Sequence, residues 1–283
     1  MLKTEQVVNK IIEALEDNKA HRIVKIDLRK QLFKEVHESL GPKLKLVVTG
    51  GAALDPETEK GFNDLGFDVE QGYGLTETAP VIAAETPKCR RLGSIGKKFP
   101  SVEVKIDDPD EEGIGELMAK GPSIMLGYYE NEEATKSALE PDGWFHTGDL
   151  ARIDKDGFIY IAGRKKSVIV LNNGKNVFPE EIETLLNKVE GIKETFVYEK
   201  KEDDGDVKVC VEIVYDKEMI KDLYHIEDEE KIKEFLWKKV KEVNKLMPKY
   251  KYVREMIVTE EPLIKTTTLK IKRHEELKKV LGK

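Results

Sequence analysis

The chain has 283 residues, of which 39% are hydrophobic and 36% are charged, and its formal net charge at pH 7 is −7. This length provides enough apolar surface for about two domains with buried cores. The acidic balance argues against nucleic acid as the main partner, because nucleic-acid-binding domains usually carry a basic surface. The two cysteines are too few for a disulfide framework, and the five histidines show no metal-ligand spacing.

The first elements in chain order are helices followed by a β-α-β unit. Apolar residues recur at helical spacing over Lys3–Glu16 and again from Leu28 to Leu40, where Gly41 and Pro42 end the second pattern. A buried strand over 45–49, a helix over 55–65 with Asp55 as its N-cap, and a strand over 67–70 then alternate. This order predicts an α/β sheet that binds ligands at the carboxyl ends of its strands.

Glycine-rich segments directly follow both predicted strands, at 50–54 and 71–78. Glycine allows a ligand to approach the backbone closely, and Tyr73 offers a flat face for a base. Thr76 can donate a hydrogen bond to a phosphate oxygen, and the carboxylate of Glu77 is a hard ligand suited to Mg²⁺. The sequence contains no Walker A motif. An ordinary tight turn remains the alternative at 50–54.

The segment 144–164 predicts a β-hairpin, because Asp154–Gly157 forms a turn signal between two alternating runs. A hairpin brings its flanks together, so we expect Asp149 and Arg164 to face one small site. A carboxylate offers two acceptor oxygens that suit a pair of ribose hydroxyls, and arginine offers a planar fork of donors. The alternative is a surface hairpin with both side chains solvated.

Short strands and turns dominate residues 93–162, with strands predicted over 102–106, 115–119 and 158–161. This pattern predicts a small β-rich, barrel-like subdomain. The acidic run 107–113 resembles a calcium loop, but the final EF-hand position falls on Ala119 where a glutamate is required. We therefore interpret the run as a solvated turn.

The remainder predicts a compact α+β domain. Its expected elements are a strand over 168–171, a turn-rich loop over 172–176, a helix from Pro179, strands over 194–200 and 207–214, a helix over 228–246, a strand over 252–259, and a polar loop over 262–273 before a final helix. We accordingly predict two domains, 1–164 and 165–283.

Several motifs stand together in one order: Gly50–Leu54, Gln71–Pro80, Gly115–Pro122, Gly127–Tyr129, Trp144–Leu150, Gly163–Lys166, Gly174–Glu183 and Lys265–Arg273. With them the chain resembles the AMP-forming acyl-CoA synthetases of the adenylate-forming superfamily, and within these it is most similar to the long-chain fatty-acid CoA ligases. The implied fold is the C-terminal part of the large adenylate-forming domain, containing the β-α-β unit and the barrel-like subdomain, followed by a mobile α+β lid.

The resemblance also implies roles for individual residues. Lys270 would be the catalytic lysine, with Thr76 and Glu77 completing the catalytic group and Glu77 holding Mg²⁺. Lys166 would be the hinge between the domains. Residues that would contact CoA are Gly174, Lys175 and Asn176. Residues that would bind the nucleotide are Gly51, Ala52, Ala53, Gly72, Tyr73, Gly74, Thr76, Asp149 and Arg164.

The implied activity is ATP-dependent conversion of a fatty acid to acyl-AMP, followed by transfer of the acyl group to CoA. Two departures stand out: Leu269 occupies the position before the catalytic lysine where the family usually has glycine, and the first half of a family member is absent from this sequence. We expect the missing half, or a partner chain supplying it, to be required for activity.

Two other functions stay open: an adenylating domain that loads a carrier-protein thiol, and a non-catalytic nucleotide-binding module. The charged N-terminus and the lack of a long apolar run lead us to expect a cytoplasmic protein. Contact with a membrane surface and assembly of several copies are left open.

Overall fold

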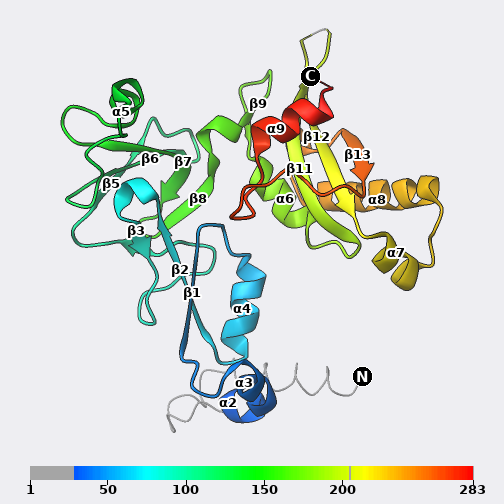
Figure 1. The fold of residues 1–283 in the computed structure, drawn as a ribbon, viewed down its shortest axis with the longest axis horizontal. Coiled ribbons are helices and arrows are strands. Elements are labelled where there is room, and N and C mark those ends of the chain that lie inside the picture. The colour runs from blue at the N-terminus through cyan, green and yellow to red at the C-terminus, as the bar shows by residue number, and fades with distance from the viewer. Residues whose placement is uncertain (1–28, 204, 283) are drawn as a thin grey trace. The chain divides into compact units, whose positions relative to one another are not determined.

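A computed structural model describes residues 29–203 and 205–282 (Figure 1). The helix expected over Lys3–Glu16 therefore lies outside the described residues. The chain divides into two compact units. The N-terminal unit contains Met1–Asp107, Leu117–Thr147 and Arg152–Ile161, and the C-terminal unit contains Asp108–Glu116, Gly148–Ala151 and Ala162–Lys283. The domain boundary between residues 164 and 165 stays a prediction.

Two short helices begin the described N-terminal unit. α2 (Arg29–Leu32) and α3 (Lys34–Leu40) replace the single helix expected to reach Leu40, and Phe33 interrupts them. His37 has a structural environment: its ring stacks on Phe67 with 4.1 Å between centroids, and its Nε2 lies 2.9 Å from the carbonyl oxygen of Leu65.

The predicted β-α-β unit is present. β1 (Leu46–Gly50) pairs in parallel with β2 (Asp68–Gly74), and α4 (Pro56–Asp64) connects them. Asp55 caps α4 by accepting a hydrogen bond from the Thr58 amide at 3.0 Å. β2 is longer than predicted because it also pairs with β3 (Val81–Ala84), so Gly72, Tyr73 and Gly74 lie in a strand and not in a loop. β4 (Lys97–Lys98) completes the order β1-β2-β3-β4.

A second four-stranded sheet has the order β5 (Glu103–Asp107), β6 (Gly115–Lys120), β7 (Phe145–Ile153) and β8 (Ile159–Arg164). The predicted β7–β8 hairpin is confirmed. The expected barrel does not close in the described part of the chain, because β5 and β8 are opposite edges of an open sheet and four strands are too few to close one. The short helix α5 (Glu132–Ala138), capped by Asn131, was not predicted because it buries no apolar residue.

The C-terminal unit is organised around a three-stranded sheet of order β11 (Ile192–Lys201), β12 (Val207–Tyr215) and β13 (Glu255–Thr259). β11 and β12 pair antiparallel, whereas β12 and β13 pair in parallel. Its other elements are η3 (Lys165–Ser167), β9 (Ile169–Val170), β10 (Asn176–Val177), α6 (Pro179–Leu186), α7 (Lys217–Tyr224), α8 (Glu229–Asn244), η4 (Lys249–Lys251) and α9 (Arg273–Val280). α7 was not predicted.

Both faces of this sheet are covered (Figure 1). On one face, side chains of α6 and α8, including Ile182 and Leu236, pack with Val197 and Val211 of the strands. On the other face, Phe196 and Cys210 pack with Leu263 and with side chains of α9. Alternating strand residues thus supply two apolar layers, as expected for a self-contained α+β domain. No helix among the described residues is long and apolar enough to cross a membrane.

Candidate active site

The glycine-rich segments lie side by side at the carboxyl ends of β1 and β2. Gly50 is the register partner of Gly72, and a Cβ atom on Gly50 would lie 2.9 Å from the carbonyl oxygen of Gly72. Gly74 is tighter, since its Cβ would lie 1.6 Å from the carbonyl oxygen of Pro80. Gly51 has a φ of 82° and begins an exposed turn with Ala52 and Ala53. Close backbone packing, together with this left-handed turn, requires glycine here.

A buried polar network beneath these strand ends holds the 50–54 turn in place. The amide of Leu54 donates to Gln71 Oε1 at 3.1 Å, and Gln71 Nε2 donates to Glu59 Oε2 at 3.2 Å. Glu85 accepts a hydrogen bond from the backbone amide of Gln71 at 3.1 Å. Glu59 is 1% exposed, and burial together with the negative charge of Glu85 raises its pKa. Sequence reasoning missed this network because its members are spread over α4, β2 and the residue that follows β3.

Thr76 and Glu77 follow β2 in the 3₁₀ helix η2 (Thr76–Thr78), with Thr76 exposed. The hydroxyl of Tyr128 donates to Glu77 Oε1 at 3.0 Å, and the amide of Met125 donates to the Glu77 carbonyl at 2.8 Å. Burial raises the pKa of Tyr128, and its hydrogen bond to the Glu77 carboxylate raises it further, so the phenol stays a donor at neutral pH. Tyr128 belongs to a quoted sequence motif but was assigned no role.

Glu77 presents the chemistry that a Mg²⁺ ligand needs. Its carboxylate is partly exposed, and the Tyr128 contact at Oε1 leaves acceptor capacity on a group with about four lone-pair sites. Among the described residues no cluster of three or more histidine, cysteine or acidic side chains could enclose a metal ion. The accessible carboxylate fits Mg²⁺, which usually binds through one or two carboxylates, water and substrate phosphates.

Asp149 and Arg164 meet across the β7–β8 hairpin, as the sequence predicted. Arg164 Nε lies 2.8 Å from Asp149 Oδ1. The alternation along β7 places Asp149 on its buried face, and only 6% of its side chain is exposed. The Arg164 side chain is 54% exposed. Asp154 closes the turn between β7 and β8, because its Oδ1 accepts hydrogen bonds from the backbone amides of Asp156 and Phe158 at 2.9 and 3.0 Å. A buried carboxylate is thus held in place beside an accessible guanidinium.

A second ion pair runs beside the first. Glu116, in β6, accepts from Lys165 Nζ at 2.7 Å and from the Gly148 amide at 3.1 Å. The Glu116 side chain is 6% exposed. The pair therefore fixes the backbone next to Asp149 and the first residue after Arg164. Sequence reasoning did not identify Glu116, because only strand pairing brings β6 beside β7.

Lys270 lies in a tight hairpin formed by residues 264–272, here named the Lys270 hairpin. Its strands meet at the bridge between Lys265 and Ile271, and the Thr266 amide donates to the Lys270 carbonyl at 2.8 Å. The Lys270 amide donates to Thr266 Oγ1 at 3.1 Å. Leu269 has a φ of 62°, in the left-handed region that favours glycine. Lys270 itself is exposed.

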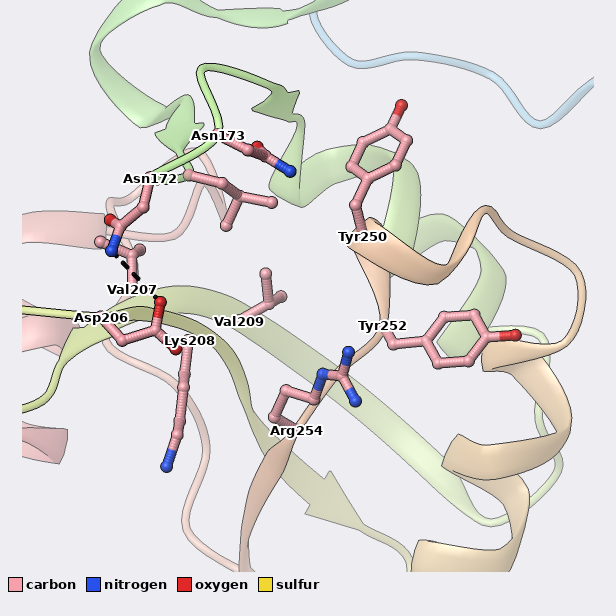
Figure 2. A pocket seen from close by; sticks show the side chains of 10 residues that line it. Asn172, Asn173, Asp206, Val207, Lys208, Val209, Tyr250, Tyr252 and Arg254 are labelled. Atoms are coloured by element: carbon pink, nitrogen blue, oxygen red, sulfur yellow. Dashed lines mark hydrogen bonds between the residues drawn. The ribbon is translucent and has the colours of Figure 1, made fainter.

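The predicted CoA contacts lie in the β9–β10 turn, at Gly174 and Lys175, and in the first residue of β10, Asn176. Gly174 has a φ of 77°, and its amide donates to the Leu171 carbonyl at 2.8 Å. Lys175 Nζ lies 4.5 Å from the ring centre of Tyr250. Next to this turn is a pocket of about 500 Å³, lined by Leu171, Asn172, Asn173, Asp206, Val207, Lys208, Val209, Tyr250, Tyr252 and Arg254. Asn172 and Asp206 lie on one side of it and the two tyrosines on the other (Figure 2).

The structure groups the predicted residues within each unit. The N-terminal unit brings together Gly51, Ala52, Ala53, Gly72, Tyr73, Gly74, Thr76 and Glu77 at the ends of β1 and β2. The C-terminal unit contains Asp149, Arg164, Lys166, Gly174, Lys175, Asn176 and Lys270, with Lys166 in η3. The roles assigned to these residues stay predictions.

Comparison with known proteins gives two family matches. The AMP-binding enzyme family matches residues 5–129, and the AMP-binding enzyme C-terminal domain matches residues 166–280. A long-chain-fatty-acid–[acyl-carrier-protein] ligase of Arabidopsis thaliana is 39% identical over 171 residues, covering 55% of this chain and 23% of the relative. A long-chain-fatty-acid–CoA ligase of Gallus gallus is 40% identical over 156 residues, covering 55% of this chain and 20% of the relative.

Among solved structures, the O-succinylbenzoate CoA synthetase of Bacillus subtilis in complex with its acyl-adenylate intermediate has a TM-score of 0.69. Its sequence is 25% identical, and the match covers 87% of this chain and 49% of the solved chain. The same enzyme in complex with ATP and magnesium ion has a TM-score of 0.68. The chain therefore spans at most half the length of these relatives. The matches at both ends, together with the shared fold, establish that the chain belongs to the AMP-binding enzyme family of the adenylate-forming superfamily.

Proposed function

We propose that this chain is the C-terminal portion of an ATP-dependent ligase that activates a long-chain fatty acid as acyl-AMP and transfers the acyl group to CoA. The observation that carries the proposal is the pairing of two glycine-rich strand ends in register, with Thr76 and Glu77 directly after the second. This arrangement provides an open backbone surface for a nucleotide, followed by a hydroxyl that can donate a hydrogen bond to a phosphate and a carboxylate that can bind a metal ion. Membership of the AMP-binding enzyme family supports it.

In the first step, ATP would bind with its adenine against Gly51, Ala52 and Tyr73 and its phosphates near Thr76. Asp149 would accept hydrogen bonds from the ribose hydroxyls, and the exposed guanidinium of Arg164 would donate hydrogen bonds to the ribose oxygens. Because Arg164 already holds Asp149 at 2.8 Å, the carboxylate needs no reorganisation on binding. Mg²⁺ held by Glu77 would neutralise charge on the phosphates.

Lys270 would act when the fatty-acid carboxylate attacks the α-phosphate of ATP, which forms acyl-AMP and displaces pyrophosphate. Two anions approach one another in this step, and negative charge develops between them. A flexible ammonium can bridge carboxylate and phosphate oxygens as the transition state forms. The Lys270 hairpin supports this role, because it leaves the side chain exposed at the end of an ordered turn.

In the second step, the CoA thiolate would attack the acyl carbon and AMP would leave. We propose that the lid turns about Lys166 between the steps and replaces Lys270 with the turn formed by Gly174, Lys175 and Asn176. The pocket beside this turn supports CoA as the acceptor, since the aromatic faces of Tyr250 and Tyr252 and the cation of Arg254 suit a phosphorylated nucleotide.

A carrier-protein thiol is the second candidate acceptor. The relative from Arabidopsis thaliana is a ligase for an acyl-carrier protein, so the likeness alone does not select between the two thiols. The fatty-acid substrate rests on the likeness to two long-chain fatty-acid ligases. The solved relative acts on O-succinylbenzoate, which makes the acyl substrate a separate question for experiment.

The test uses the complete enzyme, meaning this chain joined to the part of the AMP-binding domain that its longer relatives carry. Wild-type and Lys270→Ala enzymes are assayed for exchange of pyrophosphate into ATP with palmitate, and for thioester formation from supplied palmitoyl-AMP. We expect Lys270→Ala to abolish exchange while thioester formation persists. Lys278→Ala, at an exposed lysine of α9, is the control. Exchange near the wild-type rate in Lys270→Ala would refute the assignment, and thioester formation with a carrier protein but not CoA would select the second candidate.

A further inference from the structure

Contacts at both ends hold the base of the Lys270 hairpin. At its entry, two glutamates accept three hydrogen bonds. The amide of Leu263 donates to Glu194 Oε2 at 3.2 Å, and Lys265 Nζ lies 2.5 Å from Glu194 Oε1. The amide of Ile264 donates to Glu276 Oε2, and Glu276 is 0% exposed. The entry to the hairpin is therefore tied to β11 through Glu194 and to α9 through Glu276.

The exit from the hairpin is held by Arg273. Its Nη1 donates to Glu183 Oε2 at 3.1 Å and its Nη2 to Glu183 Oε1 at 2.9 Å, which makes a bidentate pair. Nη2 also donates to the Val197 carbonyl at 2.8 Å, and the guanidinium lies 5.0 Å from the ring centre of Phe196. Glu183 accepts from the Val197 amide at 2.7 Å. One arginine, three residues after Lys270, is thus joined to α6 and β11 together.

The burial of this pair distinguishes it from a surface ion pair. The side chain of Glu183 is 10% exposed and that of Arg273 is 25% exposed. By contrast, both side chains of the Lys272–Glu275 ion pair at the start of α9 are more than 40% exposed. Two parallel hydrogen bonds fix both the distance and the plane of the guanidinium, which lysine cannot reproduce. Because the α9 helix begins at Arg273, this contact sets where the hairpin ends and the helix starts.

We propose that Glu183 and Arg273 are positioning residues for Lys270. This inference rests on the proposed catalytic role of Lys270. The bidentate pair fixes the exit of the Lys270 hairpin against α6 and β11, while Glu194 and Glu276 fix its entry, so that the ammonium is presented from a rigid base. A misplacement of about 1 Å at a reacting group costs on the order of 10²-fold in rate. Loosening one end of the hairpin should therefore slow adenylation without weakening nucleotide binding.

The experiment compares Glu183→Gln, Arg273→Lys and the double variant with Lys278→Ala as the matched control. In the complete enzyme we expect each single variant to lower kcat for pyrophosphate exchange by about 10²-fold. KM for ATP and thioester formation from supplied palmitoyl-AMP should stay within about twofold of wild type, as expected for an interaction that acts on one step. The double variant should be no slower than the slower single variant, because one interaction is removed in all three.

A second measurement needs no catalysis. Amide hydrogen exchange of this chain should be at least about tenfold faster at Thr266, Leu269 and Lys270 in Arg273→Lys, while amides of β12 keep wild-type protection. Equal losses of rate in both half-reactions, together with a general loss of amide protection, would show a merely structural role and overturn the proposal. Unchanged rates of amide hydrogen exchange in the hairpin would also overturn it. If Lys270→Ala keeps its pyrophosphate exchange, the proposed function fails. If Lys270→Ala is inactive in pyrophosphate exchange while Arg273→Lys is fully active, only the positioning role is refuted.

Discussion

Asp149 and Arg164 face each other from the two strands of one hairpin, and the Asp149 carboxylate is buried while the Arg164 guanidinium is accessible. This asymmetry suits a site in which the acid is fixed and the arginine can also reach a ligand. If Asp149 accepts the ribose hydroxyls, Asp149→Ala should weaken AMP and ATP binding by about 1.5–3 kcal/mol, the usual loss for a hydrogen bond to a charged group.

Titration calorimetry with AMP measures this effect. Asp142→Ala is the control, since it removes an exposed carboxylate from the turn before β7. Equal affinities for Asp149→Ala and wild type would exclude Asp149 from the nucleotide site.

A second prediction concerns Leu269, which stands where the family usually has glycine. Its φ of 62° is unfavourable for a residue with a Cβ by about 1–2 kcal/mol, and its side chain makes few contacts because 77% of it is exposed. In the interior of a helix or strand, alanine is about 0.5–1 kcal/mol more stabilising than glycine. Here we expect the reverse order: the free energy of unfolding of Leu269→Gly should exceed that of Leu269→Ala.

Urea denaturation of the two variants decides this point, because both lose the leucine side chain beyond Cβ and differ only in the Cβ itself. If Leu269→Ala is the more stable of the two, the left-handed conformation at this position is not a source of strain.

A third prediction follows from Glu59. Burial and the nearby charge of Glu85 raise its pKa, so the native state binds a proton more readily than the unfolded state does. The stabilising contribution is complete at low pH and is lost as pH rises from the ordinary carboxyl pKa through the raised one. Glu59→Gln removes this dependence, and its amide nitrogen can occupy the place of Oε1, which has no hydrogen-bond partner among the described residues.

Free energies of unfolding measured between about pH 4 and pH 7 test the sign. The difference in stability between Glu59→Gln and wild type should grow in favour of the variant as pH rises. Glu111→Gln, in an exposed turn, should show no such trend. A constant difference for Glu59→Gln across the range would contradict the prediction.

The elements predicted well from the sequence are those specified by local signals. Asp55 before Pro56 predicted the start of α4, and the Asp-Gly turn predicted the β7–β8 hairpin and the meeting of Asp149 with Arg164. Each signal lies within a few residues of the feature it determines. The Gly72–Gly74 segment was assigned to a loop because glycine is unusual in strands, but pairing with both β1 and β3 stabilises it as part of β2.

The contacts that complete the candidate site could not be predicted, because they join residues far apart in the chain. Tyr128 is separated from Glu77 by 51 positions, and Arg273 is separated from Glu183 by 90. No local pattern distinguishes Arg273 from other basic residues of the tail. The β-rich subdomain predicted as barrel-like is an open four-stranded sheet for a related reason: strand number and pairing, which periodicity does not report, decide whether a sheet closes.

A fourth prediction is that this chain by itself does not form acyl-CoA. Thr76 and Glu77 are the groups assigned here to the phosphates, and preorganised donors around a transferring phosphate usually supply the largest catalytic term. An acyl chain would also need a closed apolar pocket to orient its carboxylate. Incubation of the purified chain with ATP, Mg²⁺, CoA and palmitate should give no thioester. Palmitoyl-CoA formation that disappears in Lys270→Ala would show that the chain is sufficient.

A fifth prediction concerns β1, which is an edge of its sheet in the described part of the chain. Val48 is 68% exposed and Leu46 is 43% exposed, so this strand combines unpaired backbone groups with exposed apolar side chains. Such an edge is a template for pairing with another strand, and a charged residue on it opposes that pairing. We expect the purified chain to self-associate, and Val48→Lys to shift sedimentation velocity profiles toward the monomer. Val170→Lys is the control, because Val170 is 55% exposed in the short β9–β10 hairpin of the C-terminal unit. If the two variants associate to the same extent as wild type, the β1 edge is not the contact between copies.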